Sequence, residues 1–144
     1  MAISTAMCTS FKQHLLEGTE NFKNSGGDTY KVALYTSSAT LGAATTGYSA
    51  TNEVGNSGSY SAGGLTLTRV DPAASGTTAF TDFADAAATG ATITSAGALI
   101  YNDTDAADPS VSSHSFGGDV TSTAGTFTVV FPAADASNAI LRLA

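Results

Sequence analysis

Two stretches near the C-terminus constrain the fold more than any other part of the chain. In Phe127–Phe131 the three large residues at odd positions would lie on one face of a strand, with Val130 on the other. After a small, polar segment with turn-forming residues at 133–138, the alternation resumes in Ala139–Leu143. The pattern predicts two strands that close a sheet, with the last residues of the chain in the core.

A helical pattern occurs in one place, from Ser4 to about Phe22, where large apolar residues recur at spacings of four and seven. Ser4 or Thr5 can cap the start of this helix, and Gly18 can end it. We expect the helix to pack across the edge or base of the sheet. A second interpretation is an arm that contacts a partner.

Period-two stretches predict further strands at Thr29–Thr36, Leu65–Val70, Thr77–Ala84, Ala91–Tyr101 and around His114–Phe116. Asp71-Pro72 is typical of a turn, and Gly97 inside a strand indicates a bulge or a close backbone approach. Helices do not alternate with these strands, which argues against a parallel α/β sheet. The sequence therefore predicts an all-β chain, a jelly-roll-like β-sandwich of seven or eight short antiparallel strands with one N-terminal helix. We expect one domain over residues 1–144, with a helix or arm at 1–24 and the sandwich at 28–144.

The segment Ser37–Gly64 consists mostly of Ser, Thr, Ala and Gly and is longer than the usual connection inside a compact domain. A loop of this length is usually functional or covered by another part of a structure.

The composition favours close contact with neighbours over binding of charged ligands. Charged residues make up 12% of the chain, about half the usual quarter, so the surface must be rich in small polar side chains. Small side chains lose little entropy when a neighbour covers them, which suits an assembly, although a small-residue-rich β protein explains the composition equally well. The net charge is −7, and the few basic residues are dispersed, so we expect no nucleic-acid partner.

Cys8 is the single cysteine and cannot form a disulfide within the chain. The N-terminus lacks a basic region followed by a long apolar run, and no apolar stretch reaches transmembrane length. We therefore expect synthesis in a reducing cytoplasm and no membrane partner.

Few residues are candidates for a chemical site. The acidic loop Asn102–Asp108 could hold a hard cation such as calcium, but Ala107 and Asp108 depart from the helix-loop-helix calcium pattern, so a solvated turn is favoured. Asp82 and Asp85 are a weak candidate for paired acid and base carboxylates.

The two histidines are weak candidates as well. His14 and Cys8 do not share a helical face as metal ligands at positions i and i+4 would. His114, Ser115 and Asp119 supply the residue types of a catalytic triad, but neighbours on a strand point to opposite faces. We expect no catalytic, metal or cofactor-binding residues, and a protein that is not an enzyme.

Four segments together, Ser4–Lys12, Tyr30–Ser37, Gly97–Asn102 and Phe127–Ala144, resemble a family of small virion structural proteins of tailed bacteriophages, especially aquatic ones. The resemblance spans essentially the whole chain and rests on strand and turn motifs. Within that group, the size and the expected β-sandwich are similar to those of capsid cement, or decoration, proteins, which bind the outer face of the head shell and bridge capsomers.

This resemblance implies the major capsid protein as a partner, together with further copies of the chain in a homotrimer or homodimer. It also implies a location on the outer capsid surface of the virion, after synthesis in the host cytoplasm. The alternative is a tail- or fibre-associated virion module that binds host-surface glycan, with exposed Tyr48 and Tyr60 stacking on sugars. For the cement function, we expect the helix or the long loop to make the contacts, because burying the acidic turn unpaired would be costly.

Overall fold

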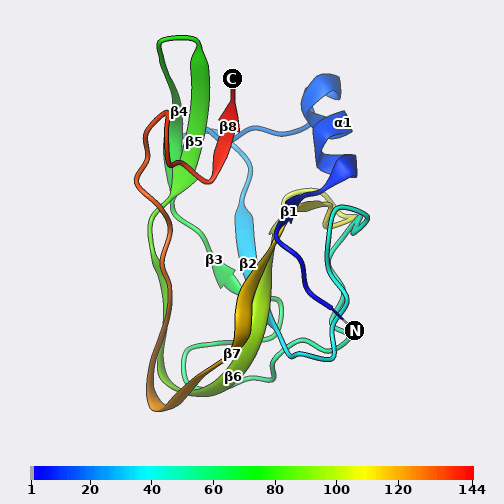
Figure 1. Cartoon of the computed structure of the whole chain (residues 1–144), viewed down its shortest axis with the longest axis vertical. Coiled ribbons are helices and arrows are strands. Elements are labelled where there is room, and N and C mark those ends of the chain that lie inside the picture. Colours follow the sequence, from blue (N-terminus) through cyan, green and yellow to red (C-terminus); the bar gives the residue numbers. More distant parts are fainter. Residues whose placement is uncertain (1) are drawn as a thin grey trace.

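The computed structural model describes residues 2–144 as eight strands and one helix (Figure 1). In chain order these are β1 (Ala6–Met7), α1 (Thr9–Glu17), β2 (Tyr30–Tyr35), β3 (Leu65–Thr66), β4 (Arg69–Ser75), β5 (Thr78–Phe83), β6 (Ala86–Asn102), β7 (Ser110–Val129) and β8 (Leu141–Leu143). The strands form a five-stranded sheet in the order β1-β7-β6-β2-β3 and a three-stranded sheet in the order β4-β5-β8, both antiparallel. The predicted all-β sandwich with one helix is confirmed.

Helix α1 is shorter than predicted, because the residues expected to cap it bond to the five-stranded sheet instead. The Ser113 hydroxyl donates to the carbonyl of Ser4 at 2.7 Å. The Ser115 N–H donates to the hydroxyl of Thr5 at 3.0 Å, and β1 then pairs with β7. Gly18 ends the helix in the left-handed conformation, as predicted. Among residues 2–144, no helix is long and apolar enough to cross a membrane.

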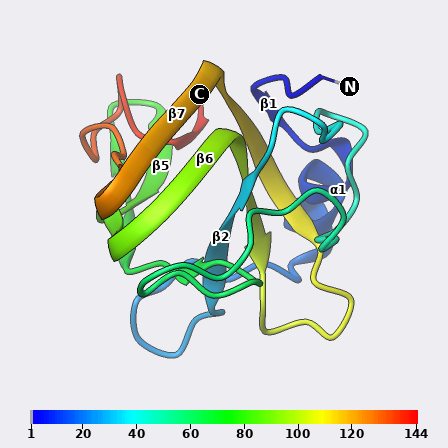
Figure 2. The same ribbon diagram turned by 90° about the horizontal axis from the view of Figure 1, so that it is seen from below.

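Strands β6 and β7 have 17 and 20 residues and form one bent antiparallel ribbon (Figure 2). The predicted strands Ala91–Tyr101, His114–Phe116 and Phe127–Phe131 are pieces of these two, the last of them ending at Val129. The sequence does not indicate that these pieces form two continuous strands, because the residues between them are small. The buried residues near the start of β6 are alanines, and an alanine alternation gives almost no apolar signal.

The ribbon changes register between Ser95 and Gly97, which marks a bulge. A Cβ added at Gly97 would lie 2.5 Å from the carbonyl oxygen of His114 and 2.7 Å from the side chain of Ile3. The bulge and the close backbone approach predicted for Gly97 are both confirmed.

The main core contains residues of α1 and of both sheets, with aromatic side chains at its centre. Phe22 lies beyond the helix in which it was predicted, yet it still meets Phe11 of α1 edge-on at 5.8 Å. On its other side it stacks on Tyr30 of β2, with ring centroids 4.3 Å apart. Phe83 of β5 packs against both Phe22 and Phe131. These rings join the helix, the two sheets and the segment after β7.

A second, smaller core lies on the other face of β2 and β6. It contains Ala33 and Tyr35 of β2, Leu99 and Tyr101 of β6, and Ala39 and Leu41 of the long segment. Residues 37–64 therefore cover the outer face of the five-stranded sheet. This cover explains why β2 is apolar on both of its faces.

The predicted turn at Asp71 and Pro72 is wrong. Both residues lie inside β4. Strand β4 is at the edge of its sheet, and its register with β5 shifts between Val70 and Ala73. Proline lacks a backbone N–H, and it is tolerated at such an edge bulge. The chain turns only at Gly76.

The two predicted C-terminal strands belong to different sheets, since β7 pairs with β6 and β8 pairs with β5. Phe127 and Phe131 are buried and Val130 is 73% exposed, as the alternation predicts. Leu141 is buried, whereas Leu143 is 58% exposed. The predicted burial of the last residues thus holds for Leu141 and is wrong for Leu143, which no other element of residues 2–144 covers.

Replacing Gly97 tests the close approach at the bulge. We expect Gly97→Ala to lower the free energy of unfolding by about 1–3 kcal/mol, because the added methyl group overlaps backbone. The matched control is Gly55→Ala, where a Cβ meets nothing within 4 Å. Urea unfolding of both variants measures the difference, and equal stability would contradict the packing described for Gly97.

The two leucines of β8 make a second matched pair. Leu141→Ala should cost about 2–5 kcal/mol, because it leaves a cavity in the main core. Leu143→Ala should stay within about 0.5 kcal/mol of the wild type, as surface substitutions do. Denaturant unfolding distinguishes them, and a large loss from Leu143→Ala would show that this side chain is core after all.

Candidate functional site

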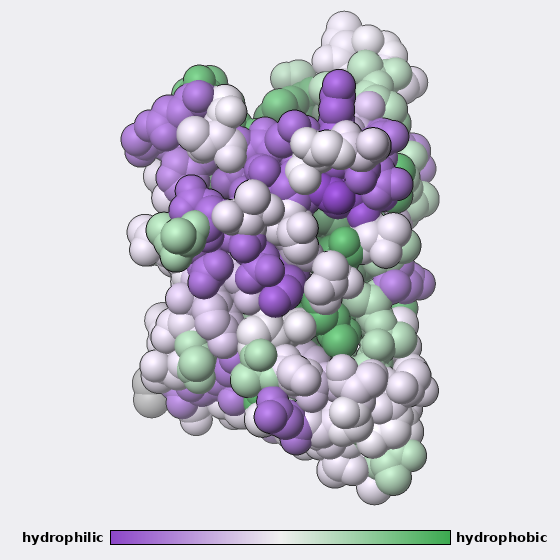
Figure 3. All heavy atoms as spheres, turned by 180° about the vertical axis from the view of Figure 1, so that it is seen from behind, coloured by the Kyte–Doolittle hydropathy of each residue, from purple (hydrophilic) through white to green (hydrophobic). Residues whose placement is uncertain are grey.

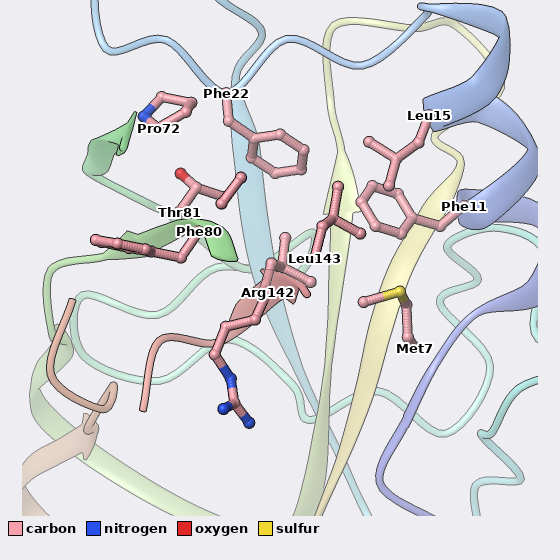
Figure 4. A pocket seen from close by; sticks show the side chains of 11 residues that line it. Met7, Phe11, Leu15, Phe22, Pro72, Phe80, Thr81, Arg142 and Leu143 are labelled. Atoms are coloured by element: carbon pink, nitrogen blue, oxygen red, sulfur yellow. The ribbon is translucent and has the colours of Figure 1, made fainter. Parts of the chain in front are cut away.

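An apolar groove of about 190 Å³ lies between α1 and the three-stranded sheet (Figure 4). Met7 of β1 with Phe11 and Leu15 of α1 forms one wall, and Leu141 and Leu143 of β8 line the other. The apolar spacing of the helix predicts a face that packs against the rest of the protein. Part of that face, at Phe11 and Leu15, borders the groove instead.

Strand β8 gives the groove a second property, an unpaired strand edge. Among residues 2–144 it pairs with β5 alone, and Figure 1 shows β8 between β5 and α1. Such an edge offers backbone N–H and C=O groups that have no partner in the sheet. Apolar side chains and free backbone groups thus lie together.

Lys12 and Leu16 of α1 lie outside the set of residues that line the groove. Leu16 is 92% exposed and follows Lys12 by four residues, so the two share the helix stripe next to Phe11 and Leu15. Arg142 also lines the groove, but its guanidinium points away from Phe11 and Leu15 and donates to the carbonyl of Ser137 at 2.8 Å (Figure 4).

Lys23 and Asp71 line a neighbouring hollow that shares Pro72 with the groove. The Asp71 carboxylate accepts the backbone N–H of Asn24 at 2.6 Å, so it is bonded within the chain.

A buried polar cluster connects the segment after α1 to the sheet. One carboxylate oxygen of Glu20 accepts the hydroxyl of Tyr30 at 2.8 Å and the side-chain amide of Asn102 at 3.0 Å. The same amide donates to Asp28, and the second oxygen of Glu20 lies 3.7 Å from Nδ1 of His14. Burial raises the pKa of Glu20, although these hydrogen bonds oppose the shift. His14 thus faces a carboxylate, and not Cys8.

Glu53 organises the long segment 37–64. Its carboxylate accepts hydrogen bonds from the hydroxyls of Tyr48 and Tyr60 and from the N–H of Gly63. Tyr60 is buried, and its hydroxyl also accepts the N–H of Leu34 in β2. Partial burial and Glu53 raise the pKa of Tyr48 to about 12. The carboxylate is therefore an anchor for the cover of the sheet.

The prediction that Tyr48 and Tyr60 are exposed for sugar stacking is wrong for Tyr60. Tyr48 is half-buried, and its ring already stacks on Tyr101 with centroids 4.7 Å apart. Sequence reasoning missed this arrangement because Glu53 carries no signal of burial in a polar segment.

The acidic loop is a turn with local contacts. Asp103 lies 3.2 Å from Lys31, and Asp105 accepts the N–H of Ala107 at 2.9 Å. The backbone carbonyl of Asp108 accepts the N–H of Tyr48. Within residues 2–144, no group of three or more metal-binding side chains of the His, Cys, Asp and Glu types gathers in one place.

Asp82 and Asp85 both fasten the C-terminal segment to the sheets. Asp82 is buried and accepts the backbone N–H groups of Phe83 and Ile140, and Asp85 accepts that of Phe131 at 2.8 Å. Burial raises the pKa of Asp82. The two carboxylates bond to separate backbone groups, so the structure gives them structural partners and not a shared cleft.

His114 bonds to a serine two residues away. Its Nε2 lies 2.8 Å from the hydroxyl of Ser112, which shares its strand face, whereas Ser115 accepts the N–H of Gly117. Burial lowers the pKa of His114, which favours the neutral imidazole, and Ser112 is buried. The triad arrangement of His114, Ser115 and Asp119 is thus not formed. Cys8 is also buried, which raises the pKa of its thiol.

On the face shown in Figure 3, hydrophilic residues gather in the upper half, and the lower half is mostly pale, the colour of residues of intermediate hydropathy. The groove itself was not predicted.

Comparisons with protein-family models, curated proteins and solved structures find no match for this chain.

The buried Glu20 generates a pH prediction. Because its folded-state pKa is raised, the stability that Glu20 contributes is fully present below its unfolded pKa and is lost as the pH rises through the folded value. Stability of the wild type relative to Glu20→Gln should therefore fall as the pH rises above the ordinary pKa of a glutamate, about 4.3. Urea unfolding at a series of pH values measures this difference. Glu17→Gln, an exposed change on α1, should not reproduce the trend, and a difference that is constant or rises with pH would refute it.

Proposed function

We propose that this protein is a capsid cement, or decoration, protein of a tailed bacteriophage, which binds the outer surface of the head shell and bridges capsomers without catalysis. The observation that carries the proposal is the apolar groove, with an unpaired strand edge and exposed leucines beside it. An exposed apolar surface of this kind is typical of a contact site. The resemblance of the chain to small phage virion proteins supplies the partner, the major capsid protein.

The composition supports the same function. Long charged side chains are few, so a neighbouring capsomer can cover much of the surface without immobilising many flexible groups. A homotrimer or homodimer that touches two or more capsomers also gains effective concentration for its second contact. Modest individual contacts then add up to firm attachment.

The buried carboxylates favour a structural use of the polar groups. Glu20, Glu53 and Asp82 each accept at least two hydrogen bonds from within the chain. A carboxylate bonded in this way holds segments of the chain together.

The proposal is tested on phage particles that carry the protein. Labelled protein should map by electron microscopy to the whole outer head surface, in a uniform copy number. Particles that lack it should have heads of unchanged geometry that rupture at a lower temperature. Adding back the wild type should restore stability, and so should the control Glu17→Gln, whose side chain lies outside the groove.

Two results would overturn the proposal. Label confined to the tail would favour the tail- or fibre-associated module that binds host-surface glycan. Heads that rupture at the same temperature with and without the protein would exclude a cement function.

A further inference from the structure

We propose that two copies of this chain pair through the free edge of β7, antiparallel about a two-fold axis, so that their β6–β7 ribbons join edge to edge. The pairing segment is Thr126–Val130. The inference concerns the contact between two copies and does not rest on binding to a capsid.

The edge of β7 that faces away from β6 is open over the second half of the strand. On this side β1 pairs with β7 only at Ser112 and Ser113, and the hydroxyl of Thr5 then accepts the N–H of Ser115. Among residues 2–144, no strand or isolated bridge takes the edge after Ser115. Figure 2 shows this half of β7 at the rim of the molecule, with β6 on its inner side. The outward N–H and C=O groups of such an edge are satisfied by an extended partner.

A hollow of about 260 Å³ runs beside the same edge. Every residue that lines it belongs to β7 or follows it directly: Phe116, Val120, Phe127, Thr128, Val129 and Val130. Neighbouring residues of a strand point to opposite faces. A hollow that touches both Val129 and Val130 therefore lies along the edge and not over one face of the sheet. A strand paired here would cover Val130, which is 73% exposed.

The sequence of the edge identifies an identical segment as its partner. The stretch Thr126–Phe131 contains only β-branched and aromatic residues, with no charge and no proline. Segments of this composition pair with copies of themselves. No charged residue lies from Val120 to Phe131, although the chain has a net charge of −7. Two copies can therefore meet at this edge without the repulsion between their acidic surfaces.

The stretch that can pair has defined ends. Ala124 has a φ of 44° and lies at a bulge in β7, where the register with β6 shifts. Phe131 donates its N–H to Asp85, and Pro132 has no N–H to donate. The glycine after the bulge is followed by Thr126–Val130, which is the pairing segment.

Pairing of this segment with its own copy places Thr128 on the two-fold axis, opposite itself. Phe127 of one copy then lies opposite Val129 of the other, and Thr126 lies opposite Val130. Threonine pairs and pairs of an aromatic with a β-branched residue stabilise antiparallel sheets. A two-fold contact of this kind uses the edge of both copies and is closed, so we expect a dimer and not a trimer.

Substitutions at Thr128 test the inference, because this exposed side chain would face its own copy. Thr128→Asp and Thr128→Lys should each weaken self-association by about tenfold, since two like charges would lie directly opposite each other. An equimolar mixture of the two variants should dimerise again, because opposite charges then meet. Thr77→Asp, at an exposed threonine between β4 and β5, should associate like the wild type. Sedimentation velocity at a series of concentrations measures each equilibrium.

Hydrogen exchange of the wild type supplies a readout that needs no variant to fold. The backbone amides of Thr126–Val130 should exchange more slowly as the protein concentration rises, because the dimer protects them. The amides of β2, which pair within the chain, should not respond to concentration.

The inference is overturned if the wild type sediments as a monomer or a trimer, or if Thr128→Asp and Thr128→Lys dimerise as tightly as the wild type. A mixture of these two variants that stays monomeric, or protection confined to another segment, would also overturn it. The particle experiment on cement function fails or succeeds separately, because a dimer joined through β7 gives these results whether or not it binds a phage head.

Discussion

The pairing of β6 with β7 is the interaction on which the rest of the fold depends. The ribbon carries β1 on one side and β2 on the other, so the five-stranded sheet cannot form without it. It also bends, and the bulge at Gly97 lets it do so while Ile3 packs against the bend. The two strands are consecutive and joined by the short loop 103–109, so the ribbon can form outward from that turn without closing a long loop.

Buried carboxylates fix the segments that the ribbon does not hold. Glu20 joins the chain after α1 to Tyr30 and Asn102, Glu53 holds the long cover segment, and Asp82 binds the C-terminal segment at Ile140. A chain with few charges thus uses several of them internally. Removing one partner of such a bond leaves a buried polar group unsatisfied, which destabilises more than the bond itself contributes.

The sequence predicts fold class well where large apolar residues alternate. The period-two alternation predicts strand β2 (Tyr30–Tyr35) and the burial of Phe127 and Phe131. Gly18 predicts the end of α1. The prediction fails where small residues form strands, as at the start of β6, because alanine gives little difference in hydrophobicity between the two faces of a strand. It also fails at Ser4 and Thr5, where hydrogen bonds to the sheet replace the expected helix cap. The groove was beyond prediction, since it depends on how far β8 lies from α1.

The open groove is a consequence of the small size of the second sheet. Three strands cannot cover the whole apolar face that α1 and the aromatic core present, and β8 contributes only three residues at the edge that faces the helix. Leu15 is only half-buried and Leu143 is exposed, so this end of α1 is incompletely packed against the sheet. The fold is therefore held here by Phe11 and Phe22, which are buried, and Leu15 and Leu143 add little to it.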